Sequence, residues 1–272
     1  MPANLFFEAG PELSVGAIFH ETTKNFRAGR LHQGYDAIES VRPVGSWHRD
    51  ALPESGEGYS LAAVDTTVCQ ERGSALETLL FRRSVRRYSG ADLQVAQLRR
   101  LLELVFPQRH STDLVTDKFP HLRIRRGPLP ISQCRLIALV LEVEGIPSGA
   151  YWYDPPTSTL HTIHPTSPRP VVERIVFQAE FHRANVIFLL TASLADTVQR
   201  YGDRGYRYML IEGGMMIQAL YLAASHLKLS GCVTGSLIQQ EFERWLGLDG
   251  YQACILNAFA IGHLPDEDSA NV

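Results

Sequence analysis

One long helical pattern constrains the fold of this 272-residue chain more than any other feature. Between residues 205 and 226, apolar and small side chains lie around most of the circumference that an α-helix would present. A helix with so little polar surface is usually central to a domain or shared between two subunits. We therefore expect the chain to fold around this helix, to pair through it, or both.

Shorter helical and strand patterns flank the long helix without strict alternation. Helices are predicted over residues 92–105, 171–179 and 239–246. Strands are predicted over residues 136–143, 150–154, 160–163, 185–192 and 253–261. The stretch that follows Gly231 is predicted to be irregular. Because helices and strands mix without an internal repeat, the predicted fold class is α+β.

Composition and charge exclude several classes of protein. A net charge of −3 gives no basic field for nucleic acid. The four cysteines lie far apart without a C-x-x-C pair, which excludes zinc-ribbon and thioredoxin-like sites and predicts reduced thiols. No metal-ligand spacing occurs among the histidines, so no metal is predicted. The apolar runs are strand-sized and the first residues do not resemble a signal peptide, which predicts a cytoplasmic protein without membrane association.

The predicted domain boundaries follow the change in periodicity along the chain. Residues 1–75 are rich in glycine, proline and charge, and we predict a partly irregular N-terminal extension there. Residues 76–264 carry the regular patterns and form the predicted main domain. Residues 265–272 form a short acidic tail.

A basic cluster just before the helix at 92–105 is the strongest chemical signal. Within seven residues it holds four arginines and one serine, namely Arg82, Arg83, Ser84, Arg86 and Arg87. Guanidinium forks, a hydroxyl and backbone N–H groups together make a site for a phosphate. A solvated basic turn would contain the same residues, so the cluster alone indicates an anion and nothing more.

A second cluster lies at the start of the long helix. Residues 199–208 contain three arginines and three tyrosines. Phenols and guanidiniums beside a buried helix can transfer protons and hold anions. A subunit interface would show the same composition.

Five segments, in this order and spacing, resemble the nitroreductase superfamily of flavin enzymes, and within it the SagB-type or McbC-like dehydrogenases. They are residues 19–24, 82–88, 149–155, 204–214 and 246–250. The resemblance implies a nitroreductase-like fold, with a mixed sheet and helices around a long central helix. It also implies an intertwined homodimer with FMN at the subunit interface.

The same resemblance implies a reaction and its partners. SagB-type and McbC-like enzymes oxidise thiazoline or oxazoline rings to thiazole or oxazole in a ribosomally made peptide. The implied partners are a cyclodehydratase and the precursor peptide. By family position, the residues that would hold the FMN phosphate and ribityl chain are Arg82, Arg83, Ser84 and Arg86.

Family position also assigns the flavin ring contacts and the base. The ring-binding loop corresponds to residues 130–135, with Pro130, Ser132 and Arg135 as contacts, and the turn at the ring edge corresponds to Thr234 and Gly235. A lysine–tyrosine pair of the family reads Arg200 and Tyr201 in this chain. Tyr201 would therefore remove a proton from the substrate ring, with Arg200 as the neighbouring charge.

Two alternatives stay open at the level of sequence. One is a more general flavin reductase or oxidase that acts on a small molecule. The other is a flavin-free docking subunit of a biosynthetic complex, which two departures from the family pattern favour. These departures are larger side chains over residues 131–137 and an arginine instead of a lysine at position 200.

Overall fold

A seven-stranded sheet forms the centre of the computed structural model, which describes residues 58–70, 74–106, 134–202, 204–250 and 253–265. The strands are β1 (Tyr59–Ser60), β2 (Arg135–Val140), β3 (Gly149–Asp154), β4 (Thr159–His164), β5 (Val186–Ala192), β6 (Ser230–Thr234) and β7 (Cys254–Gly262). They lie in the order β1-β4-β3-β2-β5-β7-β6. The fold is α+β, as predicted.

Every described pair of neighbouring strands is antiparallel, so the prediction of a mixed sheet is wrong. The strands β2, β3 and β4 follow one another through short turns, and a short turn can join only antiparallel neighbours. A parallel contact does occur outside the strands, as a single bridge between Leu93 and Val143.

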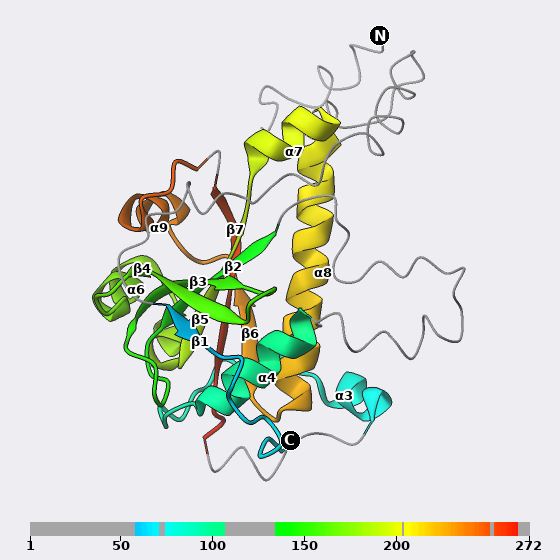
Figure 1. Ribbon diagram of the computed structural model, residues 1–272, viewed down its shortest axis with the longest axis vertical. Coiled ribbons are helices and arrows are strands. Elements are labelled where there is room, and N and C mark those ends of the chain that lie inside the picture. The colour runs from blue at the N-terminus through cyan, green and yellow to red at the C-terminus, as the bar shows by residue number, and fades with distance from the viewer. Residues whose placement is uncertain (1–57, 71–73, 107–133, 203, 251–252, 266–272) are drawn as a thin grey trace, which may run out of the picture.

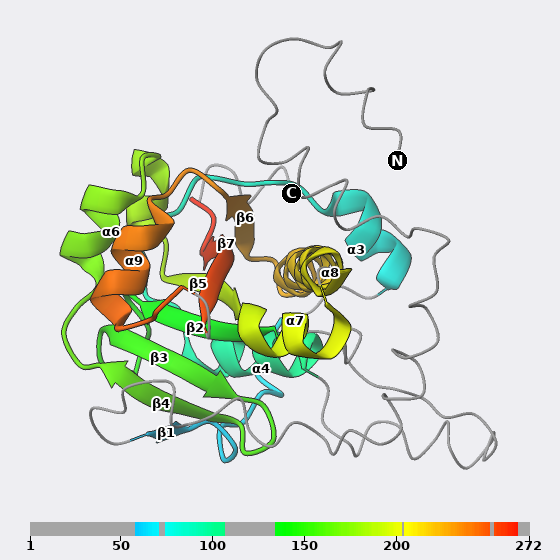
Figure 2. The same cartoon turned by 90° about the horizontal axis from the view of Figure 1, so that it is seen from above.

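Helices cover both faces of the sheet. They are α3 (Ala75–Phe81), α4 (Val95–Val105), α6 (Arg169–Ile175), α7 (Leu194–Tyr201), α8 (Arg204–His226) and α9 (Gln239–Leu246), with a 3-10 helix η3 (Ala179–Arg183) after α6. Figure 2 shows α6 and α9 on one face of the sheet and α4 and α8 on the other. The sheet therefore lies between two helical layers.

The apolar core is divided by the sheet into two clusters. Along β5, Phe188 and Leu190 belong to the cluster on the α4 and α8 side, whereas Ile187 and Leu189 belong to the cluster on the α6 and α9 side. Successive side chains of a strand point to opposite faces, so a strand covered on both sides must be apolar throughout. This explains the continuous apolar run that predicted a buried strand over residues 185–192.

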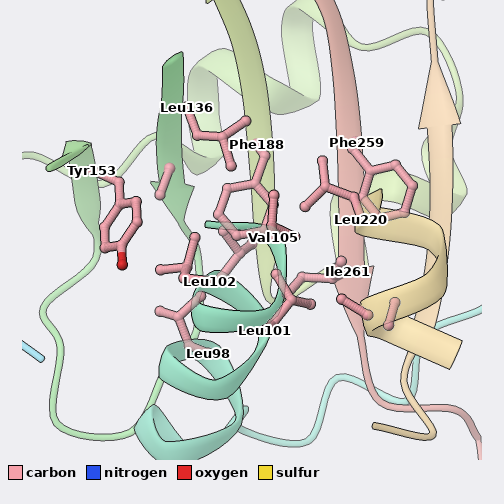
Figure 3. Close-up of a cluster of buried hydrophobic side chains, with 14 of the residues drawn as sticks. Leu98, Leu101, Leu102, Val105, Leu136, Tyr153, Phe188, Leu220, Phe259 and Ile261 are labelled. Atoms are coloured by element: carbon pink, nitrogen blue, oxygen red, sulfur yellow. The ribbon is translucent and has the colours of Figure 1, made fainter. Parts of the chain in front are cut away.

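The α4 side of the core is close-packed around four residues of that helix. Figure 3 shows Leu98, Leu101, Leu102 and Val105 directed toward side chains of the strands and of α8. Their spacing places them on one helical face, as the sequence pattern predicts for residues 92–105. The helix begins at Val95, three residues later than predicted.

The central helix predicted over residues 205–226 is confirmed as α8, which runs along most of the height of the described part of the molecule (Figure 1). One side of α8 buries Met209, Met216 and Leu220 in the core. The other side exposes large apolar side chains, with Leu210, Ile211 and Met215 between 46% and 50% exposed. The helix is thus central and also carries an uncovered apolar side.

Three elements differ from their predictions. The segment after Gly231 was predicted to be irregular, but residues 230–234 form β6 and pair with β7. Residues 194–201 form the unpredicted helix α7. The helix predicted over residues 171–179 ends at Ile175, because Val176 turns extended and forms a bridge with Leu237.

Part of the predicted N-terminal extension joins the main sheet. The short strand β1 pairs with β4, and Leu61 beside it is 1% exposed within the main core. The division into extension, domain and tail stays a prediction, and residues 19–24 and 266–272 lie outside the described residues. The four cysteines are reduced thiols, and the helices of the described part are all too short or too polar to cross a bilayer.

Candidate functional site

The arginine cluster begins where α3 ends. Ser74 caps the start of α3 through its Oγ, which accepts a hydrogen bond from the Glu77 N–H at 3.1 Å. At the other end the Arg82 N–H donates to the Thr78 carbonyl at 3.0 Å. Arg82 itself has non-helical backbone angles, so the chain leaves the helix at the first arginine of the predicted anion site.

After Arg82 the chain lies alongside β6. The Val85 N–H donates to the Gly231 carbonyl at 3.1 Å, and Ser230 Oγ donates to the Arg87 carbonyl at 2.9 Å. We call residues 82–88 the arginine segment. Its backbone is therefore anchored to an ordered strand instead of being a solvated turn.

Side chains of the arginine segment also contact the long helix. Ser84 Oγ donates to the Tyr221 hydroxyl at 3.0 Å, and the Arg82 guanidinium lies over the Tyr221 ring at 5.2 Å from its centroid. Tyr88 points from the segment into the core, where it is 4% exposed. Burial raises the pKa of the Tyr88 phenol, so this residue acts as an uncharged anchor.

Three guanidiniums of the segment carry positive charge without a compensating carboxylate among the described residues. Among the described residues, the ion pairs lie elsewhere, and none of them involves Arg82, Arg83 or Arg86. Arg83 donates to the Leu80 and Arg82 carbonyls at 3.2 and 3.3 Å, which leaves donors of its guanidinium available. Guanidiniums that have no carboxylate partner within the described part of the chain are suitable donors for a phosphate.

A small pocket lies beside this charge. Arg83, Tyr221, Lys228 and Gly231 are among the residues that line it. Lys228 follows α8 with a positive φ of 55° and lines this pocket together with Arg83. The pocket therefore has two cationic residues in its lining, Arg83 and Lys228.

The turn after β6 offers an open backbone. Thr234 is buried, and its Oγ1 donates to Gln178 Oε1 at 2.9 Å while accepting from the Ser236 N–H at 3.1 Å. Gly235 is exposed, and a Cβ placed there would meet no heavy atom within 4 Å among the described residues. A flat ring could approach this backbone closely.

The predicted ring-binding loop is described only at its end. Pro130 and Ser132 lie outside the described residues, while Arg135 begins β2 and is partly buried. Burial lowers the pKa of the Arg135 guanidinium, and the nearby carboxylates of Asp154 and Glu212 oppose that shift. Arg135 therefore keeps its charge at the start of β2, beside Asp154 of β3.

The predicted base lies at the opposite end of α8. Arg200 and Tyr201 are the last residues of α7, and the Tyr201 ring packs edge-on against Tyr208 with 5.5 Å between centroids. Tyr208 and Tyr221 are separated by about 20 Å along the helix axis, at about 1.5 Å per residue. Figure 1 shows α7 and α3 at opposite ends of α8. Within one chain, Tyr201 and the arginine segment are therefore not brought together.

Sequence reasoning missed two residues beside the arginine segment, Tyr221 and Lys228. Tyr221 was grouped with the apolar positions of the long helix, and Lys228 was not considered. A hydroxyl on an otherwise apolar helical face was the one available signal for Tyr221, since a buried phenol usually finds a hydrogen-bond partner. The other partner, Ser84, is 137 residues away in sequence.

Comparison with known proteins defines the class of fold. The chain has the nitroreductase-like fold: a structure described as a nitroreductase from Anabaena variabilis aligns with 94% of this chain at a TM-score of 0.67 and 21% identity. This chain spans about half of that protein, 49% of its length. The E. coli microcin synthetase McbBCD complex with truncated pro-MccB17 bound aligns with 91% of this chain and 87% of the other, at a TM-score of 0.56 and 15% identity.

Sequence comparison finds similarity to proteins of the same kind. The model of the nitroreductase family matches residues 161–263 of this chain. A protein of Methanocaldococcus jannaschii that is described as a nitroreductase is 25% identical over 183 residues, which cover 66% of this chain and 87% of the relative. Residues 161–263 include α8, β6 and the turn at Gly235, whereas the arginine segment lies outside the matched range.

Proposed function

We propose that this protein is an FMN-dependent oxidoreductase that holds the cofactor phosphate at the arginine segment. The observation that carries this proposal is the group of Arg82, Arg83 and Arg86, uncompensated by any carboxylate in the described part of the chain and anchored to β6. The open backbone at Gly235 supports a site for the flavin ring. Gly235 follows four residues after Gly231, whose carbonyl is bonded to the arginine segment. Bound FMN would supply a two-electron acceptor, while the chain supplies binding and orientation.

An absorption spectrum of the purified protein tests the cofactor. After incubation with FMN and removal of the excess, we expect the flavin bands between the near ultraviolet and the blue to remain with the protein. Arg82→Ala and Arg86→Ala should each raise the Kd for FMN at least about tenfold, because each removes a charge-assisted hydrogen bond. The control is Arg244→Ala, which removes an exposed arginine of α9. A colourless wild-type protein would instead favour the flavin-free docking subunit.

We further propose that the substrate is an azoline ring in a ribosomally made peptide, presented by a cyclodehydratase. The five segments of family resemblance and the likeness of fold to the McbBCD complex support this finer assignment. Oxidation to the azole breaks two bonds to hydrogen, so one hydrogen leaves as a proton that the chain must accept. Tyr201 is our candidate acceptor, with Arg200 as the neighbouring charge.

A thiazoline peptide distinguishes this reaction from a general reductase. We expect its conversion to the thiazole with loss of two hydrogen masses, measured by mass spectrometry, without added NADPH. Rapid bleaching of the flavin bands by NADPH, with no change in the peptide, would instead favour the general flavin reductase.

The distance between Tyr201 and the arginine segment leads us to propose that the active site is shared in a homodimer. Exposed apolar side chains on α3 and on α8, among them Leu76, Leu80, Ile211 and Met215, support pairing through these helices. If two α8 helices pair antiparallel, Tyr201 of the partner subunit lies near the arginine segment. Each site would then contain residues of both chains.

Mixing two inactive variants tests this arrangement. Arg82→Ala and Tyr201→Phe should each lose turnover, yet a mixture that exchanges subunits should recover about a quarter of wild-type activity. Half of the dimers in an equal mixture are mixed, and each mixed dimer has one intact site if the site is shared. A mixture without activity, in spite of subunit exchange, would place both residues in one chain's site.

A further inference from the structure

The hydroxyl of Tyr221 connects three segments that are far apart in sequence. Tyr221 lies in the last turns of α8 and is 8% exposed. Its oxygen accepts hydrogen bonds from Ser84 Oγ and from the Val233 N–H, both at 3.0 Å. One oxygen atom thus ties the arginine segment to α8 and to β6.

The ring of Tyr221 contacts a second residue of the arginine segment. The Arg82 guanidinium lies 5.2 Å from the ring centroid, within the range of a cation–π contact. Phe259 of β7 packs edge-on against the same ring, with 4.8 Å between centroids and 89° between planes. The core therefore sets the orientation of a ring on which Arg82 rests.

The count of hydroxyl protons indicates what changes when an anion binds. Ser84 has one proton and directs it to Tyr221, and Tyr221 directs its own to the Cys232 thiol at 3.8 Å, a long and weak contact. An ionised phosphate is a much stronger acceptor than a phenol. If Ser84 turns its proton to the phosphate, its oxygen becomes free to accept the proton of Tyr221.

The rearranged bonds form a chain in which every donor has an acceptor. The Val233 N–H donates to Tyr221, Tyr221 to Ser84, and Ser84 to the phosphate. Hydrogen bonds that follow one another in this way strengthen each other. Two hydroxyl rotations accomplish the change, and the backbone bond from Val85 to Gly231 stays in place.

We propose that Tyr221 is a positioning residue for the FMN phosphate, acting on Ser84 through its hydroxyl and on Arg82 through its ring. This inference rests on the proposed function, because it takes the bound anion to be the phosphate of FMN. Tyr221 lies outside the five segments that carry the family resemblance, so the assignment comes from the contacts of this chain.

The test compares FMN with riboflavin, which has the same ring system and no phosphate. Tyr221→Phe keeps the ring contacts with Arg82 and Phe259 and removes only the hydroxyl. By quenching of flavin fluorescence, we expect its Kd for FMN to rise about tenfold while its Kd for riboflavin stays unchanged. Ser84→Ala should give the same selective loss, and the double variant should bind FMN no more weakly than Ser84→Ala alone.

A matched control is Tyr151→Phe, which removes another buried phenol hydroxyl. Tyr151 lies on β3 and donates to the Pro147 carbonyl at 2.7 Å, apart from the arginine segment. Its Kd for FMN should equal that of the wild type. In the unmutated protein, the Val233 amide proton should shift further in NMR spectra with FMN than with riboflavin, which tests the same chain without any variant.

The outcomes distinguish the role of Tyr221 from the proposed function on which it rests. Equal FMN affinity of wild type and Tyr221→Phe, or an equal loss for FMN and riboflavin, overturns the role of Tyr221 and leaves the proposed function intact. An equal shift of the Val233 amide with both ligands does the same. A wild-type protein that binds neither flavin overturns the proposed function itself, and the role of Tyr221 with it.

Discussion

Two glycines near the site, Gly231 in β6 and Gly235 directly after that strand, have opposite surroundings. A Cβ at Gly231 would lie 2.9 Å from Phe259 Cζ and 3.1 Å from Ala224 Cβ, whereas a Cβ at Gly235 would meet open space among the described residues. Gly231 is thus required by packing. Packing does not require a glycine at position 235, so the space beside its backbone is available for a ligand.

Alanine at these two positions should separate stability from binding. We expect Gly231→Ala to lower the free energy of unfolding by about 1–3 kcal/mol through overpacking, and Gly235→Ala to change it by less than about 0.5 kcal/mol. Gly235→Ala should nevertheless weaken flavin binding, because its methyl group enters the proposed ring site. Urea unfolding and flavin titration measure the two effects, and unchanged binding would argue against a ring at Gly235.

His263 should make stability depend on pH. Burial lowers the pKa of His263 below its ordinary value, so the folded chain resists protonation more than the unfolded chain does. Above the ordinary histidine pKa, His263 is neutral in both the folded and the unfolded chain, and no stability is lost. As the pH falls through about 6.5, the unfolded state gains the proton first and stability declines. Thermal unfolding between pH 7 and pH 5 should therefore show a smaller decline for His263→Gln than for the wild type, and equal declines would contradict this.

At the scale of elements, prediction succeeded where one periodic pattern set the whole element. The helices at 92–105 and 205–226 and the buried strand at 185–192 were all recognised from their apolar spacing, and α9 was predicted with its observed bounds. The strand β6 was missed because it is short and begins with Ser, Gly and Cys, so only Val233 and Thr234 give it intrinsic strand preference. Its structure comes from pairing with β7, which lies more than twenty residues later in the chain.

The site was predictable only in its local part. Arginines and a serine close together in sequence indicate an anion, and the structure keeps them together on one anchored segment. The contact between Ser84 and Tyr221, and the separation of Tyr201 from the arginine segment, depend on how α8 lies against the sheet. No spacing in the sequence carries that information, because those contacts are set by tertiary packing.

Variants in one helix on each face of the sheet test whether the two apolar clusters unfold together. Leu102 of α4 and Phe242 of α9 are both fully buried, in different clusters. Each alanine variant should lower the free energy of unfolding by about 3–5 kcal/mol. Because both clusters share one sheet, urea unfolding of either variant should stay a single transition. Two separate transitions would mean that each helical layer is stable without the other.

At the scale of the whole molecule, the uncovered apolar side of α8 predicts self-association. Ile211→Glu should convert a wild-type homodimer into a monomer, measured by light scattering during gel filtration, because it places a charge within the proposed interface. Turnover should be lost with the dimer if the site is shared, because Tyr201 and the arginine segment then belong to different chains. The control is Phe177→Ser, which changes a side chain that is 69% exposed after α6. A wild-type monomer would refute the proposed pairing.

The placement of the arginine segment also affects how the protein behaves at high concentration. β6 is the last strand on its side of the sheet, and strands in that position readily recruit strands from other molecules. Here the outward carbonyl of Gly231 is already bonded to Val85, and the outward N–H of Val233 to Tyr221. The contacts that prepare an anion site therefore also block the strand from templating intermolecular β-aggregation, and losing them should lower solubility as well as affinity.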